Sequence, residues 1–230
     1  MKRTLKGIFA LFIVCYFSTS VFASKIPIGP DLAFGLGGSF GVYNALAVKG
    51  DGMKYHPDFG YQGGLIMEKM FSNRYGIHTG FWFTYGTISF DMTDTSGTIP
   101  DAAFDFMSVS VPALFIFSFN AKKVSLNLLS GFTLNHFICS HMRYTDSTNV
   151  DHSSDVLHYL NYVNVAVTAG FNIKFHVSQF SDFFIGILGD FNCLEMLRDT
   201  HGDDMSYVYS GRVISGVMFR TDIFPMMKRK

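Results

Sequence analysis

Bulky apolar residues alternate with small or polar residues along most of the chain between Asp31 and Phe224. In the first segment the even positions are Phe34, Leu36, Gly38, Phe40 and Val42, and the odd positions are Ala33, Gly35, Gly37, Ser39 and Gly41. A period of two places alternate side chains on opposite faces of a β-strand. Bulky residues dominate one face, and the few charges share the other face with glycine and serine. This pattern is typical of a barrel with an apolar outer face and a polar lumen, as in outer-membrane barrels.

Eight segments carry this alternation and predict an all-β, eight-stranded antiparallel up-and-down transmembrane barrel. Their approximate ranges are 31–46, 58–71, 75–91, 104–119, 124–143, 157–177, 183–198 and 207–224. The links 72–74, 120–123 and 179–182 are tight, whereas 47–57, 92–103, 144–156 and 199–206 are longer and polar. Short turns face the periplasm in such barrels, so we expect both termini there.

The composition favours strands over helices as the membrane-spanning elements. Hydrophobic residues make up 48% of the chain and aromatic residues 17%. Beyond the N-terminal segment, no stretch approaches the roughly 18 apolar residues of a membrane helix. A closed barrel can meet lipid because it pairs its backbone polar groups internally. A soluble periplasmic lipid carrier is a further interpretation, and the outward Phe115, Phe117 and Phe119 argue against it.

Residues 1–23 have the features of a secretory signal peptide. Lys2, Arg3 and Lys6 precede a short apolar run over 8–17, and Val-Phe-Ala at 21–23 predicts cleavage after Ala23. The mature part, 24–230, is then one outer-membrane β-barrel domain, exported to the bacterial outer membrane. Cleavage leaves 15 basic and 18 acidic side chains, a net charge of −3. This balance argues against a nucleic-acid partner.

Strand parity places several ionisable side chains in the lumen. They are Glu68, His78, Lys174, Asp190, Arg212 and Arg220. Eight strands leave an interior just wide enough for side chains, so bare charges there would be costly and should pair. We predict that Arg212 or Arg220 contacts Asp190 or Glu68. We favour a structural plug of salt bridges over an ion or proton path, and Trp82 is predicted to fill the lumen beside small neighbours.

Serine and histidine gather toward the loop end of the strands, where an outer-membrane lipid-modifying enzyme could hold a Ser-His set. These residues are His136, Ser140, His141, His152, Ser153, Ser154, Asp155, His158 and His201. Neither a catalytic set nor a metal site has fixed spacing on a defined element. We therefore expect no enzymatic activity, no metal site and no cofactor, with the lipid-modifying enzyme and a narrow pore as the alternatives.

Two cysteines and the charges of the links complete the candidate chemistry. Cys139 is expected on the lumen face and Cys193 on the lipid face, on strands that are not neighbours, so we expect no disulfide. The longer loops are acidic and could bind divalent cations that bridge lipopolysaccharide phosphates, although solvated loop charge is the simpler interpretation. Basic residues gather at the opposite rim, at Arg74, Lys122, Lys123 and 228–230, and could meet an acidic periplasmic partner.

A short motif resembles a known family. The stretch 107–117, Met-Ser-Val-Ser-Val-Pro-Ala-Leu-Phe-Ile-Phe, is followed by a Lys-bearing turn and a strand with Gly131. It is similar to the fourth strand of PorT-like β-barrels of Bacteroidetes outer membranes, and the glycine-rich segment 35–41 is also similar. One member of that family is tied to type IX protein secretion. The resemblance implies an outer-membrane barrel but no residue-level role, because the motif residues look structural.

The sequence therefore predicts a non-enzymatic integral outer-membrane barrel with a structural or accessory role, such as a component of a secretion or transport assembly. Its expected partners are outer-membrane lipid and lipopolysaccharide, together with periplasmic or envelope proteins.

Overall fold

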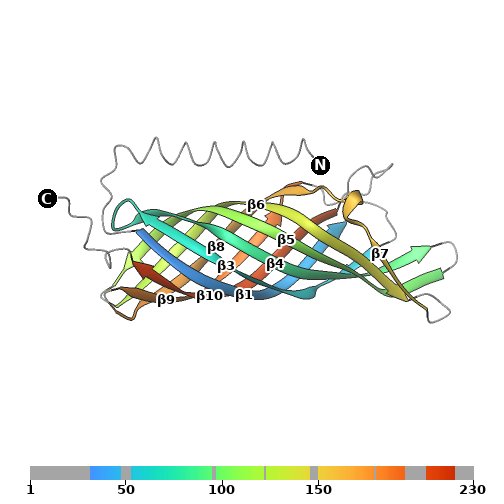
Figure 1. The fold of residues 1–230 in the computed structure, drawn as a ribbon, viewed down its shortest axis with the longest axis horizontal. Coiled ribbons are helices and arrows are strands. Elements are labelled where there is room, and N and C mark those ends of the chain that lie inside the picture. Colours follow the sequence, from blue (N-terminus) through green and yellow to red (C-terminus); the bar gives the residue numbers. More distant parts are fainter. Residues whose placement is uncertain are drawn as a thin grey trace.

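Eight long strands close into an antiparallel barrel (Figure 1). The structure, a computed structural model, describes residues 32–47, 53–94, 97–121, 123–145, 150–178, 180–194 and 206–220. The barrel strands are β1 (Leu32–Ala47), β3 (Asp58–Met70), β4 (Tyr75–Asp94), β5 (Gly97–Asn120), β6 (Val124–Thr145), β8 (Val163–His176), β9 (Ser181–Asn192) and β10 (Ser206–Arg220). Because β1 pairs with both β3 and β10, the first and last strands close the ring. The predicted eight-stranded antiparallel barrel is confirmed.

The strands run further at the loop end than the sequence suggested. Two short strands, β2 (Met53–His56) and β7 (Asp151–Asp155), pair there with β4 and β6. Within the expected loop 92–103, residues 92–94 and 97–103 instead continue β4 and β5, and Met92 pairs with Ile99. Backbone hydrogen bonds between consecutive strands do not require alternating side chains. The two strands therefore stay paired beyond the residues where the apolar and polar positions alternate. About 9–11 residues cross a membrane, whereas β5 has 24 residues, so β5 is longer than a membrane crossing requires. At this end β4 and β5 extend past the other barrel strands (Figure 1).

The segment expected to begin a strand at 157 forms a turn of 3-10 helix, η1 (Leu157–Tyr159). Leu160, which follows it, is fully buried, and β8 begins only at Val163. Leu160 forms an isolated β-bridge and packs into an apolar cluster of the barrel interior, so the strand begins later than the alternation predicted. Within the described part of the chain, no helix has the length and hydropathy to cross a membrane.

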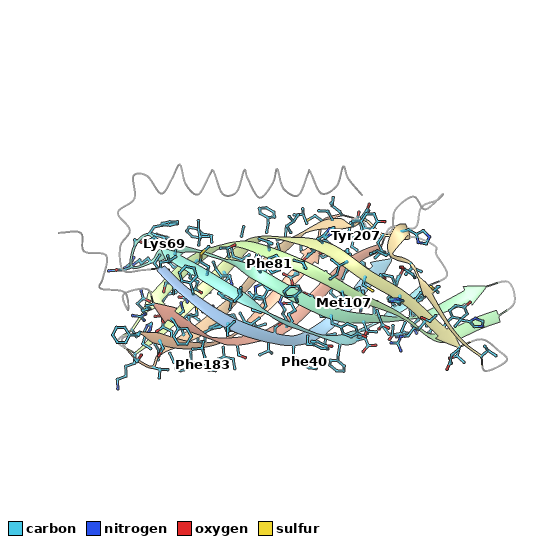
Figure 2. All side chains as sticks on the ribbon, in the orientation of Figure 1. Phe40, Lys69, Phe81, Met107, Phe183 and Tyr207 are labelled. Atoms are coloured by element: carbon cyan, nitrogen blue, oxygen red, sulfur yellow. The ribbon has the colours of Figure 1, made fainter. Side chains whose placement is uncertain are left out.

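The bulky face of each strand points outward. Phe40, Phe83 and Ile187 are each at least half exposed, and Phe40 and Phe183 lie on the outside of the barrel (Figure 2). The opposite faces carry the buried residues, including Trp82, which was predicted to fill the lumen and is 6% exposed. Exposed bulky side chains around a buried polar interior are the arrangement expected of a barrel in lipid.

Pro112, in the motif of β5, lies on the buried lumen face and interrupts one ladder. The pairing of β4 with β5 includes Thr79 with Ala113 and Trp82 with Ser110, with no paired residues between them. A proline has no N–H to donate, so it removes a ladder hydrogen bond. On its other side Pro112 still pairs with Thr133 of β6.

A β-bulge in β6 reverses the strand faces near the loop end. Met107 pairs with Cys139, but the next residue, Ser108, pairs with Phe137, so Ile138 is an extra residue. Such an insertion moves the following side chains to the opposite faces. Cys139 therefore shares the outer face of Met107, and its predicted lumen position was wrong. Cys139 and Cys193 are both free.

Candidate functional site

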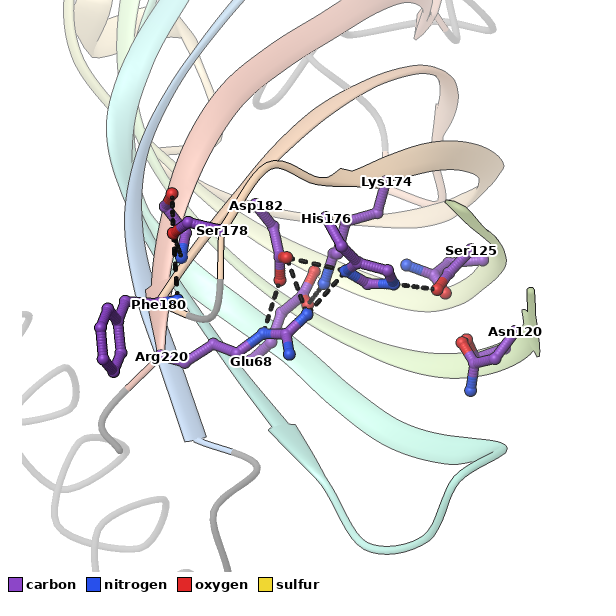
Figure 3. Close-up of polar contacts among 12 residues, drawn as sticks. Glu68, Asn120, Ser125, Lys174, His176, Ser178, Phe180, Asp182 and Arg220 are labelled. Carbon is purple, nitrogen blue, oxygen red and sulfur yellow. Dashed lines mark hydrogen bonds and ion pairs between the residues drawn. The ribbon is translucent and has the colours of Figure 1, made fainter. Parts of the chain in front are cut away.

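The ionisable side chains of the lumen form two separate groups. The first, which we call the mouth cluster, lies at the end of the barrel with the short turns and comprises Glu68, His78, Lys174, His176, Asp182 and Arg220 (Figure 3). Short turns mark the periplasmic end of an outer-membrane barrel, so the mouth cluster lies at the periplasmic opening.

Glu68 is the centre of the inner half of the mouth cluster. Its side chain is 2% exposed and contacts the ammonium group of Lys174. Its other oxygen lies 3.1 Å from Nδ1 of His78, because Glu68 and His78 are paired residues on β3 and β4. Each oxygen of this buried carboxylate therefore has one partner, which satisfies the requirement that a buried charge be paired.

Asp182 is the centre of the outer half. Arg220 donates from Nε to Oδ2 of Asp182 at 3.0 Å and from Nη2 to Oδ1 at 2.7 Å, a bidentate pair. Nδ1 of His176 lies 2.8 Å from Asp182 Oδ1 and 2.6 Å from Arg220 Nη2. One ring nitrogen cannot donate to the carboxylate and accept from the guanidinium at once, so the protonation of His176 selects one of these two contacts.

A cavity of about 280 Å³ opens between these groups. Besides the charged residues, its lining includes Ser72, Asn73, Ser118, Asn120, Ser125 and Asn127. Ser125 Oγ lies 2.8 Å from Nε2 of His176. The lining is thus rich in hydroxyl and amide groups, and the cavity suits a polar occupant.

Two apolar clusters divide the lumen beyond the mouth. Along β10 the lumen side chains run Arg220, Met218, Ile214, Arg212, Ser210 and Val208. Met218 and Ile214 belong to an inner apolar cluster with Trp82 and Phe184. Val208 belongs to a loop-side apolar cluster. Polar and apolar layers therefore alternate along the barrel axis.

The second ionisable group lies between the two apolar clusters. Arg212 contacts Asp190, and their side chains are 8% and 12% exposed. Asp190 also accepts hydrogen bonds from Thr168 at 2.6 Å and Ser210 at 3.1 Å. The cavities that Arg212 lines here are only about 30 and 20 Å³, near the size of single waters.

The loop-side apolar cluster closes the other end of the lumen. It contains Tyr43, Ile88, Phe90, Phe104, Phe106, Phe137 and Leu160. The rings of Phe106 and Phe137 meet edge-on with their centroids 5.6 Å apart. Leu160, which follows η1, packs into this cluster. The segment that links β7 to β8 therefore contributes to the apolar packing at the loop end of the lumen.

The serine and histidine candidates at the loop end are not assembled into a site. Ser140 lies inside the barrel, fully buried, and its hydroxyl has no hydrogen-bond partner among the described residues. His141 is exposed, and its Nδ1 lies 3.4 Å from Cys139 Sγ on the outer face. Successive residues of a strand point to opposite faces, and the bulge at Ile138 puts Ser140, rather than His141, on the lumen face of β6. Among the described residues, no group of three or more His, Cys, Asp or Glu side chains could hold a metal ion.

A further ion pair lies on the outer face of the projecting strands. Arg143 of β6 holds Asp105 of β5, with Nη2 2.9 Å from Oδ1, and Thr87 donates to the same oxygen at 2.8 Å. Asp105 is 15 residues from the periplasmic end of β5, beyond the membrane-crossing part. Partial burial raises the pKa of Asp105, but the hydrogen bonds from Arg143 and Thr87 outweigh it and hold the pKa below its usual value.

Of the residues expected in the lumen, the structure brings together Arg212 with Asp190 and Lys174 with Glu68. Arg220 meets neither Asp190 nor Glu68 but Asp182, which the sequence reasoning had assigned to a turn. His176 was also missed. Both share the even parity of Lys174 and Phe184, so the alternation continued to the strand ends could have identified them.

Comparison with known proteins identifies the class. The family model described as outer membrane protein beta-barrel domain matches residues 22–192. The chain therefore belongs to this family, and its place is the bacterial outer membrane.

Three solved outer-membrane proteins are similar to the chain. OprG from Pseudomonas aeruginosa is 11% identical with a TM-score of 0.50, over 84% of this chain and 96% of that one. Ail of Yersinia pestis is 17% identical with a TM-score of 0.40, over 83% and 99%. Neisserial surface protein A is 13% identical with a TM-score of 0.42, over 82% and 98%. The similarity to OprG concerns the fold alone. No curated protein matches the chain.

Proposed function

We propose that this barrel is a non-enzymatic outer-membrane protein with a structural or accessory role, serving as the membrane component of a larger secretion or transport assembly. The observation that carries the proposal is the filled lumen. Two apolar clusters lie across it, with ion pairs at the mouth and between them. A packed interior favours a mechanical or docking role over conduction, because eight strands enclose little more than their own side chains.

The assembly in question is suggested by the PorT-like resemblance. Membership of that narrower family is part of the proposal and rests on the motif at 107–117 and on Gly131. The motif's proline interrupts the β4–β5 ladder, and a Cβ at position 131 would lie 2.2 Å from the carbonyl oxygen of Ala113. Close strand packing thus accounts for both residues, in line with a structural use of the motif.

Export and partners are included in the proposal. The signal peptide 1–23 is removed after Ala23, and 24–230 forms the mature domain. The outer surface contacts lipid and lipopolysaccharide, and the periplasmic turns contact a periplasmic or envelope protein. The intact mass of the purified protein tests the cleavage site: it should correspond to a chain that begins at Ser24.

The non-enzymatic part is supported by the separation of Ser140 from His141 across the barrel wall. The hydroxyl of Ser140 is fully buried in the lumen, so it is not accessible to a lipid substrate in the outer leaflet. The salt-bridge plug, formed by Glu68, His78, Lys174, Asp190, Arg212 and Arg220, is proposed to have a structural role. These groups form two sets of ion pairs, and the cavity that both His78 and Arg212 line is only about 20 Å³. This arrangement suits a plug better than a continuous path.

Conductance in planar lipid bilayers tests the proposed sealed lumen. The purified barrel should give no unitary current steps. A double variant, Trp82→Gly with Phe184→Gly, removes two large rings from the inner apolar cluster and shows whether a leak through this layer can be detected. Stable steps from the unaltered protein would contradict the sealed lumen.

Photo-cross-linking in cells tests the accessory role. A photo-reactive residue at Ser178, an exposed turn position, should yield a discrete protein adduct, whereas one at Phe40 on the lipid face should not. Absence of an adduct, together with unchanged secretion and transport in a strain lacking the protein, would contradict the accessory role.

A further inference from the structure

The mouth cluster has unused hydrogen-bond donors but few unused acceptors. Both oxygens of Glu68 and both oxygens of Asp182 have partners. Lys174 has three N–H donors, and among the described residues it contacts only Glu68. Arg220 directs Nε and Nη2 to Asp182 and His176, and Nη1 contacts none of the residues that the structure describes. The cavity therefore offers cationic donors to an acceptor-rich group.

Access to these donors is possible through the cavity. Lys174 and Arg220 both line the 280 Å³ space, together with side chains of the first periplasmic turn such as Asn73. Lys174 is more than nine-tenths buried, and Arg220 is one-third exposed, nearer the opening. A ligand that enters from the periplasm would meet Arg220 first and Lys174 deeper in the cavity.

The rim around this opening is basic. The three periplasmic turns, 71–74, 121–123 and 177–180, contain Arg74, Lys122 and Lys123 and no Asp or Glu. Arg74 and Lys123 are exposed. The carbonyl of Arg74 accepts from the N–H of Ser118 at 2.7 Å, and that of Lys123 from the N–H of His176 at 2.9 Å. Both basic residues are thus anchored beside strand residues that line the cavity.

We propose that the periplasmic mouth of the barrel binds an acidic peptide segment of a periplasmic protein. Arg74 and Lys123 attract the segment by charge, and Arg220 and Lys174 bind one of its carboxylates within the cavity. Long-range attraction raises the rate of encounter, while the partly buried donors give hydrogen bonds to a charged acceptor. The inference rests on the accessory role proposed above and specifies the chemistry of the partner.

Peptide binding to the mature protein in lipid nanodiscs tests this directly. The probes are capped hexaglutamate, hexaglutamine and hexalysine peptides, and inorganic phosphate serves as a free anion. Hexaglutamate should bind, and added salt should weaken it. Lys123→Gln combined with Arg74→Gln should lower the affinity about tenfold. Lys54→Gln, which removes an exposed cation at the opposite end of the barrel, is the matched control and should leave it unchanged.

A second measurement shows whether the peptide enters the cavity, and it requires no substitution in the mouth cluster. A spin label on hexaglutamate should broaden the methyl NMR signal of Met70, which lines the cavity, and spare that of Met107 on the outer face. Equal affinity for hexaglutamine, an equal effect of Lys54→Gln, or broadening of Met107 alone would overturn the proposal. Phosphate binding without peptide binding would also overturn it and would identify a free-anion site. None of these outcomes affects the conductance measurement or the photo-cross-linking in cells. The accessory role is therefore tested independently of the peptide-binding proposal.

Discussion

Lys174 and Glu68 form an ion pair across the full width of the barrel. Lys174 lies on β8 and Glu68 on β3, and in the closed ring three strands separate them on either side: β9, β10 and β1 one way, and β6, β5 and β4 the other. Most other lumen ion pairs join neighbouring strands, as Arg212 and Asp190 do. The pair therefore ties opposite walls together beneath the inner apolar cluster.

Lys174→Met should destabilise the barrel by about 3–5 kcal/mol, because it leaves the carboxylate of Glu68 buried with only His78 beside it. Urea unfolding in lipid vesicles, followed by gel mobility without boiling, measures the loss. Lys123→Met, at an exposed turn, should change stability by less than about 0.5 kcal/mol. The double variant Glu68→Met with Lys174→Met should recover much of the loss, since it removes both charges. A loss in the double variant equal to that of Lys174→Met would contradict this account of the pair.

The pair of Arg212 and Asp190 should respond unequally to truncation. Arg212→Met leaves Asp190 with the hydroxyl donors of Thr168 and Ser210, so we expect a loss of about 1–3 kcal/mol. Asp190→Ala leaves a buried guanidinium without its counter-ion, and we expect about 3–5 kcal/mol. The same unfolding measurement compares them. If Arg212→Met were the more damaging, the hydroxyl donors would not be compensating the carboxylate.

Asp105 should titrate below its usual range. Its pKa is lowered in the folded state, because the hydrogen bonds from Arg143 and Thr87 outweigh the effect of burial. The ionised Asp105 carboxylate therefore stabilises the folded barrel at pH values above its unfolded pKa of about 3.9. This stabilisation is lost as the pH falls through the folded pKa. NMR titration of the Asp105 carboxyl carbon measures the direction. In Arg143→Gln the midpoint should rise, and an unchanged midpoint would rule out Arg143 as a cause.

Alanine at Ser140 should leave folding and cellular function unchanged. The hydroxyl is buried and finds no hydrogen-bond partner in the part of the chain that the structure describes, so its removal costs no hydrogen bond there. His141→Ala, on the outer face, is the matched variant and should also leave folding and cellular function unchanged. Mass spectrometry of the envelope lipids provides the assay. A lipid modification that disappears in either variant, with the barrel still folded, would restore the enzyme alternative.

The barrel and its inside-out polarity could be predicted because the alternation is a local property of each strand. Phe34 and Phe40 share one face whatever their neighbours are, and Lys174 follows the parity of Asn172. The alternation also predicted a contact of Arg212 or Arg220 with Asp190 or Glu68, and of these the structure shows Arg212 with Asp190. These inferences required only the period of two and the cost of burying a bare charge.

Other features depended on interactions that the pattern does not contain. The extra residue at Ile138 reversed the faces of Cys139 and Ser140, and a bulge of this kind is set by pairing with β5. The opposition of Lys174 and Glu68 across the lumen follows from closure of the ring and from depth along the axis. A single strand's pattern contains neither the closure of the ring nor the depth of a residue along the axis. For that reason the sequence did not predict that Glu68 contacts Lys174 and His78.

Fluorescence quenching of Trp82, the single tryptophan of the chain, tests most directly which face of the strands meets lipid. In vesicles that contain brominated lipid, the emission of Trp82 should be nearly unquenched, because the ring is 6% exposed and packed in the lumen. The double variant Trp82→Phe with Phe83→Trp moves the indole one residue along β4 to a position where the side chain is 56% exposed, and it should be strongly quenched. Strong quenching of Trp82 with weak quenching of the variant would contradict the polar-lumen barrel.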